Sequence, residues 1–180
     1  MEEEFPYGIK LNKPKDIPKE KEWGFTAEDL ELILKRQEDV ALIRGKVISS
    51  ALYVEHELDY FLCRTFFKDN SKEKELFREL LLEKEFFTFM QKWKLLGELL
   101  DAEIIKLKEQ KDKKRLMRLL HEIMEVRNRF AHGSIVSLGT IPNLEYSQEG
   151  KKRLIELNGD YFTHLKGIFN KAIELLYSII

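Results

Sequence analysis

The chain has 180 residues, of which 43% are hydrophobic and 35% are charged, with a formal net charge of −1. This balance predicts one soluble globular domain with a sizeable core, and the near-zero charge excludes a protein held to nucleic acid by its overall field. A single cysteine, Cys63, excludes an internal disulfide, and the lack of a signal peptide or a long apolar run predicts a cytoplasmic protein that does not span a membrane.

The first part of the chain is predicted to be an arm followed by a long helix. Residues 1–25 hold three of the four prolines and many lysines, and this composition cannot bury a core. We therefore expect an extended arm over 1–25 and a helical domain over 26–180. The first helical pattern runs from Ala27 to about Phe67, and a break near Gln37 or Gly45 is left open.

The middle of the chain is predicted to hold a short helix and a longer one. The short helix covers Lys72 to about Leu82, and the longer one covers about Phe89 to Lys108. The segment from Lys106 to Arg118 has seven basic residues against two acidic ones. It is either a solvated connection between helices or a local positive field close to the next helix. In the second interpretation the RNA-binding residues are Lys113, Lys114, Arg115 and Arg118.

The chemistry of the chain is concentrated at the end of a helix that is expected to begin near Lys113. The helical period puts Arg127 on or beside the buried stripe, where an unpaired guanidinium is costly. Asn128 and His132 are four residues apart and share a helical face. Gly133 suits a left-handed turn just after the helix. The apolar stripe of this helix is Leu116, Leu119, Leu120, Ile123, Val126 and Phe130.

After Gly133 the pattern changes from helical to alternating. Short strands are predicted over 134–138 and 143–146, and 153–157 could form a third. Asn158 is expected to cap a last helix that ends near Ser178. The predicted fold class is mainly α, an up-and-down helical bundle with a small β-hairpin before the C-terminal helix.

Three segments of the chain carry a resemblance to a known family. The string Arg-Asn-x-Phe-Ala-His-Gly, from Arg127 to Gly133, resembles the signature of the HEPN (higher eukaryotes and prokaryotes nucleotide-binding) superfamily. Residues 51–58 resemble the first core helix of that family. Residues 88–96 resemble a middle helix in the branch of mannitol-operon repressor-like proteins, and a hairpin after the motif is typical of that branch. The resemblance covers about residues 38–178 and implies an HEPN-like bundle.

The resemblance implies metal-independent cleavage of RNA by a homodimer whose motif helices meet at the two-fold axis. Histidine titrates near neutral pH, so His132 is the expected acid–base group. Arg127 would hold phosphate oxygens as charge develops, and Asn128 would orient the reacting groups. Glu55 is the carboxylate expected to support Arg127, and Arg129 is a further RNA-binding residue. No cofactor and no metal ion are predicted.

Alternatives remain at two levels. Arg127 and His132 could simply satisfy the last carbonyls of their helix. If the motif is functional, the protein is either an endoribonuclease, acting as a toxin or antiviral effector with an antitoxin or defence-system partner, or a regulatory module that keeps the fold and the dimer without turnover. The complete Arg-Asn-x-x-Ala-His string favours the enzyme. The Glu55–His56 and His121–Glu125 pairs are weak metal candidates, because two ligands do not make a site.

Overall fold

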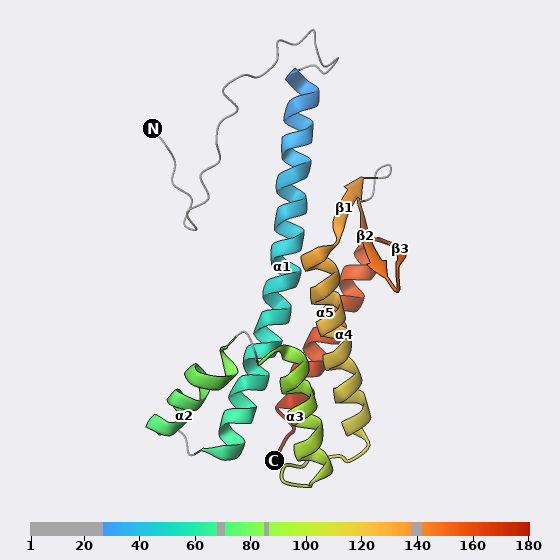
Figure 1. Ribbon diagram of the computed structural model, residues 1–180. Coiled ribbons are helices and arrows are strands. Elements are labelled where there is room, and N and C mark those ends of the chain that lie inside the picture. Colours follow the sequence, from blue (N-terminus) through green and yellow to red (C-terminus); the bar gives the residue numbers. More distant parts are fainter. Residues whose placement is uncertain (1–26, 68–70, 85–86, 138–141) are drawn as a thin grey trace. The chain divides into compact units, whose positions relative to one another are not determined.

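The computed structural model divides the chain into two compact units, Met1–Ala41 and Leu42–Ile180. The predicted arm lies outside the described residues, and of the first unit the structure describes the opening turns of helix α1, which begins at Ala27 (Figure 1). No described helix is both long enough and apolar enough to span a membrane. The structure describes residues 27–67, 71–84, 87–137 and 142–180.

The described residues are mainly helical, with a small three-stranded antiparallel sheet near the C-terminus (Figure 1). This confirms the predicted fold class at that level, and the third strand, which the sequence left open, is present. In chain order the elements are α1 (Ala27–Phe66), α2 (Lys72–Phe77), the π-helix η1 (Arg78–Leu82), α3 (Phe89–Asp101), α4 (Asp112–His132), β1 (Ser134–Ser137), β2 (Pro142–Gln148), β3 (Lys151–Glu156) and α5 (Gly159–Leu176).

Helix α1 is continuous through Gln37 and Gly45, so the break left open by the sequence does not occur. Within the second unit it buries one stripe at helical spacing, as an amphipathic helix does. A fully buried valine or leucine side chain contributes about 1.5–3 kcal/mol to folding relative to an exposed one. The buried residues of the stripe are Val47, Ala51, Val54, Leu58 and Leu62.

Helix α4 has the boundaries and the buried face that the sequence predicts. All six residues of the expected stripe are buried. Helix α3 packs beside it, and the Trp93 indole Nε1 donates a hydrogen bond of 2.8 Å to the carbonyl oxygen of Met117. The core of the second unit therefore runs along α4, the helix that carries the motif.

Helix α3 ends at Asp101, and the predicted end at Lys108 is wrong. The chain reverses where Glu103 adopts a positive φ of 54°. Beyond it Ile105 and Leu107 are buried while Lys106 and Lys108 are exposed, an alternation typical of extended chain. Lys106 pairs with Ile180 through two backbone hydrogen bonds of 3.1 and 2.7 Å. A contact with the distant C-terminal segment thus replaces the last turns of helix.

The sheet and the last helix follow the motif helix directly. The strands are in the order β1-β2-β3, and Leu144 at the centre of the sheet is fully buried. Leu144 pairs with Ile135 on β1 and with Ile155 on β3. The Asn158 side chain accepts a hydrogen bond of 2.9 Å from the backbone N–H of Tyr161, which confirms the predicted cap of α5.

Candidate active site

The polar residues of the motif lie on the last two turns of α4. Asn128 and His132 are exposed, and His132 is the last residue of the helix. Residues four apart on a helix are neighbours, so the amide and the imidazole share one solvent-facing surface. The motif therefore presents a titratable group and an amide to solvent at a fixed end of the core helix.

Gly133 does not adopt the left-handed turn expected from the sequence. Its φ is −81° and its ψ is 167°, which is extended backbone. Glycine is required here for space, because a Cβ at this position would lie 2.5 Å from the Arg129 carbonyl oxygen and 2.8 Å from that of Glu145. The absence of a side chain lets β2 approach the end of the motif helix directly.

Helix α1 also reaches this end of the motif helix. The Arg44 guanidinium donates a hydrogen bond of 2.8 Å from Nη2 to the carbonyl oxygen of Gly133. The bond is partly buried and joins segments 89 residues apart in the chain. A cation from another helix thus satisfies a carbonyl at the point where α4 passes into β1.

Arg127 faces Glu55 on α1, the carboxylate that the resemblance implies for it. Its Nη1 lies 4.0 Å from Oε2 of Glu55 on α1, and the two side chains are 35% and 14% exposed. At this distance the contact is an ion pair and not a hydrogen bond. Glu55 Oε2 has no hydrogen-bond partner among the described residues. Glu55 therefore balances the charge of Arg127 while the guanidinium keeps its N–H donors.

Two further charged residues, Lys92 and Asp59, lie behind this pair, and neither was predicted from the sequence. Lys92 on α3 donates hydrogen bonds of 2.9 Å to both Glu55 and Asp59, and its side chain is only 5% exposed. Lys92 occupies a position of the apolar α3 stripe, four residues before Leu96. A lysine at a stripe position is the signal that could have revealed the cluster, since an unpaired buried ammonium is expensive.

The four residues Glu55, Asp59, Lys92 and Arg127, the interhelix charge cluster, join α1, α3 and α4. Burial raises the pKa of Asp59 to about 6, although the hydrogen bond and charge of Lys92 act to lower it. The negative charge of Glu55 raises it further. Asp59 therefore gains its proton at a pH only slightly below neutral.

Arg129 points to the sheet. Its guanidinium lies 5.1 Å from the centre of the Tyr146 ring on β2, a cation–π distance. Its Nη2 lies 3.8 Å from Glu125 one turn earlier. The predicted RNA-binding residue is therefore held between α4 and β2, three residues before His132.

The basic segment at the other end of α4 is remote from the motif. Arg118 and Lys113 precede His132 by 14 and 19 residues. At a rise of 1.5 Å per residue they lie about 21 and 28 Å away along the axis. Lys113 also pairs with Asp101. Arg129 thus adjoins the motif, whereas Lys113, Lys114, Arg115 and Arg118 lie near the start of the helix.

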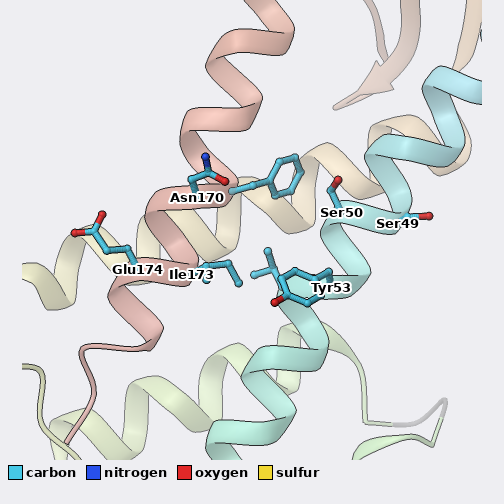
Figure 2. A pocket seen from close by; sticks show the side chains of 8 residues that line it. Ser49, Ser50, Tyr53, Asn170, Ile173 and Glu174 are labelled. Carbon is cyan, nitrogen blue, oxygen red and sulfur yellow. The ribbon is translucent and has the colours of Figure 1, made fainter.

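A hollow of the second unit also lies apart from the motif. It has a volume of about 600 Å³, and Figure 2 shows it between α1 and α5. None of the predicted site residues lines it. In the part of the chain that the structure describes, no three His, Cys, Asp or Glu residues come together as a metal site. The residues around the hollow are Ser49, Ser50, Tyr53, Val54, Phe169, Asn170, Ile173 and Glu174.

Comparisons with protein-family models, with curated proteins and with solved structures find no match to this chain.

Proposed function

We propose that the protein is a metal-independent endoribonuclease of the HEPN type, with Arg127, Asn128 and His132 as its catalytic set. The observation that supports this most is the placement of Arg127. It is balanced by Glu55 at 4.0 Å, yet it is 35% exposed and holds no hydrogen bond with that acid. A guanidinium oriented in this way can still bind a phosphate through two parallel hydrogen bonds.

The chemistry is a transfer within the RNA itself. The ribose 2′-oxygen attacks the neighbouring phosphorus as its proton passes to an imidazole, and the bond from phosphorus to the 5′-oxygen breaks as that oxygen accepts a proton from a second imidazole. The products are a 2′,3′-cyclic phosphate and a 5′-hydroxyl. Arg127 stabilises the extra negative charge on the phosphoryl oxygens. Asn128, one turn before His132, orients the ribose or the imidazole.

The reaction needs both a base and an acid, and each chain supplies one His132. We therefore propose a two-fold dimer in which two motif helices face each other. The exposure of Asn128 and His132 leaves their surface available to a second copy. Light scattering should give a dimer at micromolar concentration. A monomer that retains full ribonuclease activity would refute the composite site.

The deciding experiment is cleavage of labelled single-stranded RNA in the presence of EDTA, with analysis of the product ends. His132→Ala should lower the rate about 10²–10⁴-fold, as loss of a general acid–base does. Arg127→Ala should lower it about 10²–10³-fold, as loss of an oxyanion donor does. His164→Ala is the matched control, because His164 is an exposed histidine on α5 outside the site. DNA should resist cleavage because it lacks the 2′-hydroxyl.

Two outcomes would contradict the proposal. Cleavage that is unchanged by His132→Ala would place the active site elsewhere. A folded dimer that cuts no RNA would leave the other class of function, a regulatory or interaction module with the same fold. Assays of an antitoxin or defence-system partner become informative only after this result is known.

A further inference from the structure

The β2–β3 hairpin separates its charges between its two faces. Residues directly opposite each other in an antiparallel pair lie on the same face, and the faces alternate along each strand. Tyr146 is opposite Arg153, and Gln148 is opposite Lys151. These four residues therefore extend the face that carries the buried Leu144. This face of the hairpin has two cations and no acid.

The other face carries the acids. Glu145 is opposite Leu154, and Glu156 is opposite Asn143. The lysine on this face, Lys152, is neutralised by Glu145 at 2.8 Å. Lys151 and Arg153 are exposed, and within the described ranges neither has an ion pair or a side-chain hydrogen bond. The two strands together carry three cations and two acids, and a third acid, Glu149, lies in the turn between them. The face that carries Leu144 thus presents cations without an acid on either strand.

The positive face adjoins the motif. Arg129 stacks on Tyr146 at 5.1 Å, and Arg129 is three residues before His132, on the neighbouring turn of α4. The backbone at Gly133 meets β2 at Glu145, the residue before Tyr146. Arg129, which also pairs with Glu125 at 3.8 Å, Tyr146 and the two exposed cations of β3 therefore form one strip from the end of α4 along the hairpin.

We propose that Arg129, Tyr146, Arg153 and Lys151, the hairpin strip, bind the single strand of RNA that leaves the cleavage site. The inference rests on the proposed function and adds the substrate class and its path. Guanidinium and ammonium groups bind successive phosphates, and the ring beside them supports a base or ribose. Arg153 and Lys151 are two residues apart on one strand, about 7 Å. That spacing suits neighbouring phosphates of one strand, whereas readers of double-stranded RNA span about 16 base pairs.

The test is binding of a fluorescently labelled single-stranded RNA, measured by anisotropy over a range of salt. All variants are made in the His132→Ala background, so that RNA stays intact. Lys151→Ala with Arg153→Ala should weaken binding about tenfold, since two solvent-exposed charged contacts are lost. The slope of log affinity against log salt should fall by about 1.4, or 0.7 for each phosphate released. Lys152→Ala is the matched control on the opposite face and should change neither quantity.

Circular dichroism and the melting temperature establish that each variant is folded. An unchanged affinity and salt slope in the double variant would overturn the inference. An equal loss of affinity in Lys152→Ala would also overturn it, because RNA would then be attracted by the overall charge of the hairpin and not by one face. An equal loss for double-stranded RNA would overturn the single-strand assignment. The outcome is separate from that of the proposed function. If the wild type cuts no RNA while the double variant still loses binding, the cleavage proposal fails and the hairpin strip stands.

Discussion

Replacing Lys92 by methionine removes the buried ammonium from the interhelix charge cluster and keeps most of the side-chain volume. The ammonium lies 2.9 Å from both Glu55 and Asp59. At an effective dielectric of about 20, each such attraction is on the order of 5–6 kcal/mol, against a burial cost of several kcal/mol for the ammonium. Methionine leaves two acids facing each other. We expect a loss of about 3–5 kcal/mol in the free energy of unfolding at neutral pH, as for other broken buried pairs.

The loss should depend on pH. Lys92 acts to lower the pKa of Asp59, so without it this pKa rises above about 6 and the acid binds its proton more readily. A protonated Asp59 no longer repels Glu55. The destabilisation by Lys92→Met should therefore be smaller near pH 5 than near pH 7.

Urea unfolding at the two pH values measures both effects. Lys94→Met on the same helix is the matched control, because Lys94 is exposed and the substitution should change stability by less than about 0.5 kcal/mol. A loss below about 1 kcal/mol for Lys92→Met, or the same loss at both pH values, would refute the compensating role of Lys92. Neutralising both acids in the Lys92→Met chain should recover part of the stability.

Three other substitutions have definite expected outcomes. The folded pKa of Asp59, about 6, exceeds its ordinary 3.8, so the wild type should lose on the order of 2–3 kcal/mol as pH rises from about 4 to about 6. Asp59→Asn should flatten that part of a stability–pH curve from urea titrations. Gly133→Ala should destabilise by about 1–3 kcal/mol in thermal unfolding, because its Cβ would overlap the carbonyl oxygens of Arg129 and Glu145. Gly167→Ala, in open space within α5, should instead stabilise by about 0.5–1 kcal/mol.

The helices that carry the fold were predictable because each buries a single stripe. The stripe of α4 and the cap of α5 depend on residues within two turns of each other, and such local patterns are visible in a sequence. The end of α3 could not be predicted from such a local pattern. The residues up to Lys108 have a composition typical of a helix, but the backbone groups of Lys106 and Lys108 pair with the C-terminal segment some 70 residues later. A non-local contact decided the local structure.

The candidate site was predictable only in part. Glu55 could be proposed as the acid beside Arg127 from the resemblance, and the two groups do lie 4.0 Å apart. Lys92 could not be found through its partners, since Asp59 and Glu55 lie 33 and 37 residues earlier. The distance of the basic segment from His132 was available from the helical rise alone. The charge separation of the hairpin could not be predicted, because it depends on the pairing register of β2 and β3, which no local sequence pattern specifies.

The bond from Arg44 to the Gly133 carbonyl has a mechanical consequence when taken with the Glu55–Arg127 pair. Arg44 and Glu55 are eleven residues apart, about three turns, so they lie on the same side of α1. Arg44 binds the Gly133 carbonyl just after the last turn of α4, and Glu55 pairs with Arg127 about one and a half turns earlier. A rotation of this part of α1 about its own axis would break both contacts at once. A partner that turned this part of α1 would therefore shift the Arg127 guanidinium and the start of β1 together.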